Sequence, residues 1–132
     1  MTNITIINTQ CANLSSVKFA FDRLDYRAKI TRDIHKIQAA DKLILPGVGT
    51  AKAAMLNLQH LGLIEVIQNL TQPVLGICLS MQLMTAFSTE GNVSTLGLMS
   101  EQTELIPDTG LPLPHMGWNR VHFDENCPLF DG

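Results

Sequence analysis

The sequence predicts an α/β domain whose sheet is mostly parallel and flanked by helices. Two observations lead to this prediction: short apolar segments rich in β-branched residues, and longer segments between them with apolar residues at helical spacing. The two kinds of segment alternate along the first two thirds of the chain, which favours right-handed parallel crossovers. With 132 residues and 45% apolar content, the chain can bury a core, and we expect one domain over residues 1–132.

The expected elements follow from these patterns in chain order. Strands are expected at residues 4–7, 26–31, 42–45 and 73–77. Helices are expected at 14–24 with Asn13 as N-cap, briefly within 33–40, at 51–61 with Thr50 as N-cap, at 63–70 beyond Gly62, and at 79–87. Pro46 is expected to end the third strand. The fourth strand should lead into its helix without a loop.

The alternation is lost after about residue 91. Residues 98–106 and 118–123 have the pattern of strands, and the proline-rich stretch 107–114 separates them.

Composition excludes several classes of function. Nine Lys and Arg against twelve Asp and Glu give a net charge of −3, which argues against a nucleic-acid binder. No apolar run is long enough to span a membrane, and the N-terminus lacks the basic segment of a secretory signal. Cys11, Cys78 and Cys127 lie too far apart to indicate a disulfide framework or a zinc site. We therefore expect a cytoplasmic protein with no metal and no cofactor.

Gly76–Ser80 has the layout of a nucleophile elbow. Cys78 stands where a strand meets a helix, with the small residues Gly76 and Ser80 two positions away on each side. The first N–H groups of the helix are free to hold an oxyanion. The alternative is a buried cysteine in a core strand.

Two further segments have features of a site. Pro46–Gly49 follows a strand at the edge where open α/β sheets place their ligands, and its glycines allow an N–H to turn toward a bound carbonyl; the alternative is a plain turn. Residues 113–119 hold His115, Trp118 and Asn119 beside prolines, which suits an interface or a capped hairpin. His35, His60 and His122 are expected on the surface.

Taken together, these motifs resemble the class I (triad) glutamine amidotransferases. Pro-Gly-Val-Gly at 46–49, Gly-Ile-Cys-Leu-Ser-Met-Gln at 76–82 and Pro-His-Met-Gly-Trp-Asn at 114–119 occur in the family's order. The last block, with residues 11–17 and 40–47, is similar to the glutaminase subunit of imidazole glycerol phosphate synthase. The resemblance implies a flavodoxin-like fold and identifies residues 1–132 as the N-terminal portion of the amidotransferase domain.

The resemblance also implies a reaction and roles for single residues. Glutamine is hydrolysed to glutamate and ammonia, and the ammonia passes to a (β/α)8-barrel cyclase subunit, the heterodimer partner in histidine biosynthesis. Cys78 matches the nucleophile, and the N–H of Leu79 with one from Val48 or Gly49 matches the oxyanion hole. Gly49 and Gln82 match substrate-binding positions. The positions matching the cyclase interface and ammonia passage are Asn13, His115, Met116, Trp118 and Asn119.

The sequence departs from the family at three places. Ser80 and Gln10 stand where relatives usually have glycine, and the His-Pro-Glu motif that carries the catalytic His and Glu does not occur in the 132 residues. We therefore expect negligible turnover from this chain alone. Two alternatives follow: a non-catalytic scaffold that docks on the cyclase, or a different cysteine hydrolase with His115 as its base.

Overall fold

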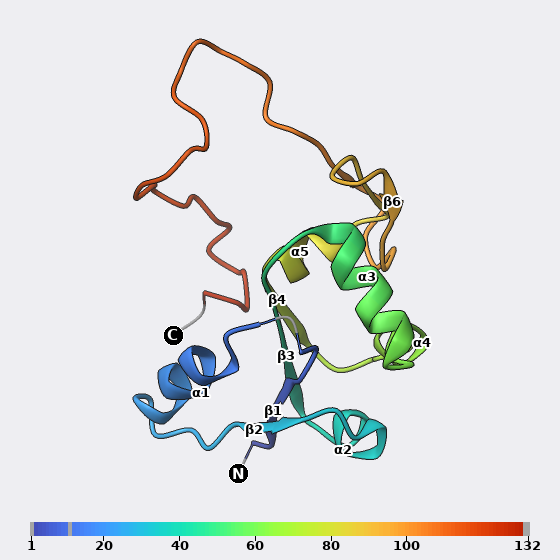
Figure 1. The fold of residues 1–132 in the computed structure, drawn as a ribbon. Helices are drawn as coiled ribbons and strands as arrows, with labels where there is room; N and C mark the ends of the chain where they lie inside the picture. The colour runs from blue at the N-terminus through green and yellow to red at the C-terminus, as the bar shows by residue number, and fades with distance from the viewer. Residues whose placement is uncertain (1, 11, 131–132) are drawn as a thin grey trace.

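A four-stranded parallel sheet forms the centre of the molecule (Figure 1). The computed structural model describes residues 2–10 and 12–130, so Cys11 lies outside the described residues. The strand order is β2-β1-β3-β4. Strand pairing is parallel throughout this sheet, which confirms the predicted α/β class with a mostly parallel sheet.

The elements succeed one another with short connections. In order they are β1 (Ile4–Ile7), α1 (Leu14–Asp22), β2 (Lys29–Thr31), α2 (Ile34–Gln38), β3 (Lys42–Gly47), α3 (Ala51–His60), α4 (Ile64–Gln68), β4 (Val74–Cys78) and α5 (Leu79–Leu83). Three two-residue strands follow, β5 (Phe87–Ser88), β6 (Val93–Ser94) and β7 (Gln102–Thr103), and form a small second sheet in the order β6-β5-β7.

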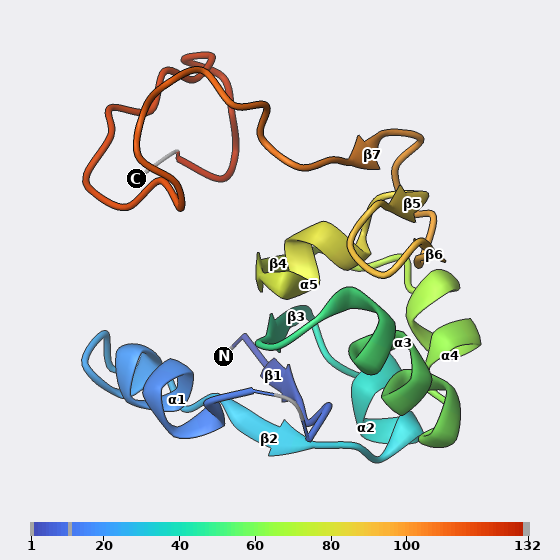
Figure 2. The ribbon, with the colours of Figure 1, turned by 45° about the horizontal axis from the view of Figure 1, so that its top comes forward.

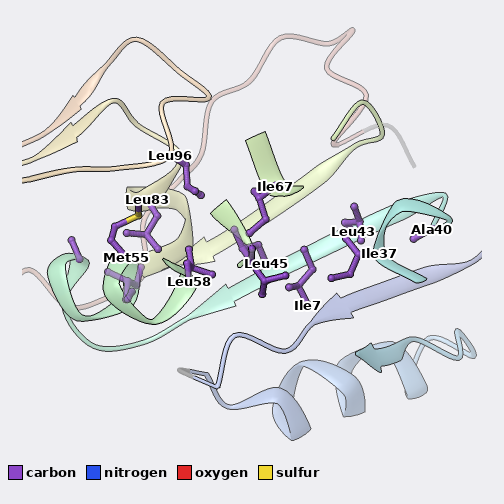
Figure 3. Close-up of a cluster of buried hydrophobic side chains, with 14 residues drawn as sticks. Ile7, Ile37, Ala40, Leu43, Leu45, Met55, Leu58, Ile67, Leu83 and Leu96 are labelled. Atoms are coloured by element: carbon purple, nitrogen blue, oxygen red, sulfur yellow. The ribbon is translucent and has the colours of Figure 1, made fainter. Parts of the chain in front are cut away.

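Helices cover the two faces of the main sheet unequally (Figure 2). On one face α1 packs alone, and its Leu14, Val17 and Phe21 contact a cluster that includes Ile6 and Ile44. On the other face α2, α3, α4 and α5 enclose the larger core. Its labelled members in Figure 3 are Ile7, Ile37, Ala40, Leu43, Leu45, Met55, Leu58, Ile67, Leu83 and Leu96. Burial on both faces explains why the β1 and β3 segments are nearly continuously apolar.

The α1 face is incompletely covered along β4. Leu75 and Ile77 lie two positions apart on this strand and therefore on the same face, and they remain 41% and 38% exposed. Leu75 lines a groove of about 480 Å³ together with Phe21, Ile44 and Leu129. This side of β4 therefore stays accessible.

The predicted helix caps are confirmed. Asn13 Oδ1 accepts a hydrogen bond from Ser16 N at 3.2 Å, and Thr50 Oγ1 accepts one from Ala53 N at 3.4 Å. Asp33 Oδ1 caps α2 through His35 N at 3.0 Å. Each side chain satisfies an N–H that lacks a partner within its helix.

The expectation that Pro46 ends the third strand is wrong. β3 continues through Gly47 because its pairing with β1 stops at Ile44, and beyond that point β3 pairs only with β4. Because no strand pairs with Pro46 on the β1 side, its missing N–H costs no hydrogen bond to a second neighbouring strand.

The helix expected at 79–87 is shorter, and ends at Leu83. Thr85 Oγ1 donates to the carbonyl of Gln82 at 2.7 Å, and Ala86 N donates to Glu101 O at 2.9 Å. These bonds turn the chain toward β5. The helix expected at 14–24 and the strand expected at 26–31 are shorter too, as the bounds of α1 and β2 show.

The strands expected at 98–106 and 118–123 are the largest errors. Only Gln102–Thr103 of the first is a strand, and the second has no regular structure. Residues 104–126 are all exposed, and the alternating pattern of 118–123 has no neighbouring strand with which to pair. Within the described ranges, no helix is both long and apolar enough to cross a membrane.

Candidate functional site at the carboxyl edge of the sheet

Cys78 occupies the junction between β4 and α5. It is the last residue of the strand and the N-cap of the helix, with φ 55° and ψ −117°. A non-glycine residue in this region is strained by about 1–3 kcal/mol. Its side chain is exposed and its thiol is free, so the alternative of a buried core cysteine is wrong. The strained turn presents the thiol outside the end of the sheet.

The end of β3 lies directly beside this junction. Gly47 is the register partner of Cys78 in the β3–β4 pair. A Cβ at Gly47 would lie 2.5 Å from Ser80 Oγ and 2.9 Å from Ser80 N. Only glycine therefore allows β3 to approach the first turn of α5 this closely.

The next two residues leave the sheet beside the thiol. Val48 is 53% exposed, and Gly49 has φ 101°, a conformation that favours glycine. Cys78, Leu79 and the Gly47–Gly49 segment are thus brought together at one edge, as the sequence predicts.

Gln82 belongs to a hydrogen-bonded network one turn along α5. Its Nε2 donates to Ser88 Oγ at 2.7 Å and to Glu90 Oε2 at 3.1 Å. The same Glu90 oxygen accepts a bond from Ala51 N at 3.0 Å, at the N-terminus of α3. Gln82 and Glu90 line an open groove of about 580 Å³, whose other walls include Thr103 and Ile106.

Glu90 is not predicted as a site residue from the sequence. The available signal was a carboxylate beside Gly91 and Asn92, both of which have positive φ. Such a turn is common, so it points to a bend in the chain and not to a site.

The predicted interface residues of the 113–119 segment lie apart from this edge. Met116 and Trp118 are 84% and 104% exposed, and Asn119 Nδ2 lies 2.9 Å from His115 Nε2. The segment after β7 first leads away from the sheet and then returns toward it, as the orange and red part of the ribbon shows, so that Leu129 lines the groove beside Leu75 (Figure 1). Asn13 caps α1 in the connection that follows the carboxyl end of β1. His115 has Asn119 as its partner and is not placed as a base for Cys78. His35, His60 and His122 are exposed, as predicted.

Comparison with known proteins identifies the family. The model of the class-I glutamine amidotransferases matches residues 3–132. The chain belongs to the class-I glutamine amidotransferase family. A solved structure described as a crystal structure of glutamine amidotransferase superimposes with a TM-score of 0.65 at 17% identity, covering 76% of this chain and 55% of that one. This likeness supports the family's fold.

Relatives within the family are much closer in sequence. The chain is 76% identical over 132 residues to the imidazole glycerol phosphate synthase subunit HisH of Haemophilus influenzae (strain 86-028NP), and covers 66% of that protein. It is 74% identical over 130 residues to the subunit HisH of Pasteurella multocida (strain Pm70), again covering 66%. The chain therefore spans slightly less than two thirds of the length of these relatives.

Proposed function

We propose that this chain carries the nucleophile half of a glutaminase site, in a subunit that supplies ammonia for the synthesis of imidazole glycerol phosphate. The observation that carries the proposal is the exposed Cys78 at the strained β4–α5 turn, in register with Gly47. Further support comes from the family, the class-I glutamine amidotransferases, and from relatives that are imidazole glycerol phosphate synthase subunits.

The proposed chemistry is attack of the Cys78 thiolate on the side-chain carbonyl carbon of glutamine. The N–H of Leu79 and one N–H of the Val48–Gly49 segment donate hydrogen bonds to the developing oxyanion. The C–N bond then breaks as the leaving nitrogen takes up the proton that the thiol has lost, so that ammonia leaves and a γ-glutamyl thioester remains for hydrolysis to glutamate. Because no His-Pro-Glu sequence occurs in the 132 residues, we expect this chain alone to turn over at a negligible rate.

Gln82 and Glu90 are the proposed substrate-binding side chains. Their hydrogen bond places a carboxylate and an amide together on the wall of one groove, one helical turn from the thiol. A carboxylate can accept hydrogen bonds from the α-ammonium group of an amino acid. An amide can donate hydrogen bonds to the polar groups beside that ammonium group and accept hydrogen bonds from them. Gly49 completes the proposed set from the β3 side.

The proposed partner is the (β/α)8-barrel cyclase subunit, with glutamine as the substrate and the cytoplasm as the compartment. Support comes from the large exposed apolar side chains of the segment after β7, among them Met116 and Trp118. Exposed aromatic and methionine side chains in one segment are typical of a protein interface. Asn119 and His115 lie in the same segment and would also contact the partner.

A covalent labelling experiment tests the site. The chain is treated with a chloroketone analogue of L-glutamine, in which the thiolate displaces chloride, and the modified residue is identified by peptide mass spectrometry. We expect modification of Cys78 that L-glutamine slows and D-glutamine does not. Cys127 serves as the internal reference thiol, and Cys78→Ala as the control variant. Equal protection by both enantiomers, or by neither, would overturn the proposal.

A further inference from the structure

Ser80 packs its side chain into the contact between β3 and α5. It is 1% exposed, although it is only two residues from the exposed Cys78. Its Oγ occupies the space in which a Cβ of Gly47 would lie, at 2.5 Å from that position. Ser80 and Gly47 are therefore interlocked, since the first turn of α5 and the end of β3 share one small volume.

Almost no free space remains around the contact between Ser80 and Gly47. The residual cavity that Ser80 and Gly47 line with Ala54 and Leu83 measures about 10 Å³. Such a space is at the limit for one water molecule, so the packing around Ser80 is tight. A larger side chain at position 80 must displace a neighbour, and the end of β3 lies directly against it.

We propose that Ser80 is a positioning residue for the oxyanion site, because a side chain no larger than serine at this position lets the Gly47–Val48 peptide lie in place beside Cys78. This inference rests on the proposed function, in which an N–H after Gly47 helps to hold the oxyanion. A donor must lie about 2.7–3.1 Å from that oxygen, so a shift of a few tenths of an ångström in β3 weakens it. Thiolate chemistry that forms no oxyanion is unaffected by the same shift.

The test compares two reactions of Cys78 in the same chain. In acylation by the γ-(4-nitrophenyl) ester of L-glutamate, the thiolate adds to the carbonyl carbon, and an oxyanion forms. The C–O bond then breaks and 4-nitrophenolate leaves with its electron pair, while the thiol proton has passed to the buffer. In alkylation by iodoacetamide, the C–S bond forms as iodide leaves, and no oxyanion occurs. Intact-mass and peptide measurements give both rates, and their ratio is the readout.

A size series at position 80 gives the expected pattern. Ser80→Gly and Ser80→Ala should keep the acylation-to-alkylation ratio within about twofold, whereas Ser80→Thr and Ser80→Val should lower it about tenfold. Ser80→Cys, with a slightly larger atom in place of Oγ, should lower the ratio about threefold and keeps the test decisive if the β-branched variants do not fold. Met81→Thr is the matched control, because Met81 is 59% exposed on the same helix and its ratio should not change.

The outcomes separate the inference from the proposed function. A ratio that is unchanged in folded Ser80→Thr and Ser80→Val, or in Ser80→Cys when those two do not fold, overturns the positioning role alone. A similar loss in Met81→Thr also overturns it, because the cause would then be the helix and not the contact with Gly47. If the unsubstituted chain is alkylated at Cys78 but acylated there no faster than at Cys127, the proposed function fails, and the inference fails with it.

Discussion

Gln10 has a left-handed backbone conformation, with φ 60°, in the loop that follows β1. For a residue with a Cβ, this conformation costs about 1 kcal/mol or more relative to glycine. Its backbone N donates to Asn8 Oδ1 at 3.0 Å, a bond that glycine would retain. We therefore expect Gln10→Gly to raise the free energy of unfolding by about 1 kcal/mol, measured by urea denaturation.

Gln59 provides the matched control for this substitution. It is an exposed glutamine within α3, where glycine is unfavourable by about 0.5–1 kcal/mol. Gln59→Gly should therefore lower the stability of the fold. If both substitutions change stability in the same direction, the strain assigned to Gln10 is wrong.

At the level of single residues, the sequence predicted the parts of the site that are contiguous in the chain. Cys78 was found because Gly76–Ser80 combines a strand end, a thiol and small neighbours in five positions. Glu90 could not be found in this way, because its proximity to Gln82 and Ala51 depends on the turn after β5. The spacing of apolar and polar residues along the chain gives no sign of the contacts that Glu90 makes with Gln82 and Ala51.

Glu90 also joins two elements, since its carboxylate caps α3 from outside the helix. The bond from Ala51 N at 3.0 Å involves a charged acceptor at the positive end of a ten-residue helix, whereas Thr50 Oγ1 lies 3.4 Å from Ala53 N. We expect Glu90→Ala to lower the free energy of unfolding by about 1 kcal/mol and Thr50→Ala by roughly half as much.

Denaturation in urea checks this order, and Glu90→Gln refines it. The glutamine variant keeps an acceptor oxygen but loses the charge, so its stability should lie between that of the unsubstituted chain and that of Glu90→Ala. A larger loss from Thr50→Ala than from Glu90→Ala would contradict the capping role of the carboxylate.

Whether a segment forms a helix or a strand was predictable where burial of apolar side chains decides it. The first and last residues of the helices and strands were not predictable. The β1 and β3 segments are apolar because both faces of the sheet are covered there, so their composition alone identifies them. The end of α5 depends instead on a hydrogen bond from Thr85 and on Glu101, far along the chain. Residues 118–123 show the converse, because an alternating pattern forms a strand only where a neighbour pairs with it.

At the scale of the whole molecule, the fold has one well-packed end and one open segment. The parallel sheet and the helices on its larger face hold the buried core, while residues 104–126 are exposed throughout. An exposed apolar segment of this kind is stable in contact with a partner surface. The proposed cyclase interface therefore involves the exposed segment 104–126 as a whole and not one motif within it.

Trp118 allows this interface to be tested directly, because it is the only tryptophan in the sequence and is fully exposed. Burial of an indole ring in an interface moves it from water to an apolar surrounding. We expect its fluorescence emission to shift to shorter wavelength when the purified cyclase subunit of imidazole glycerol phosphate synthase is added. Trp118→Phe, titrated in parallel, supplies the cyclase's own signal for subtraction, and Met116→Ala should weaken binding because that side chain lies in the same exposed segment. An unshifted emission at saturating cyclase would show that residues 115–119 are not the contact surface.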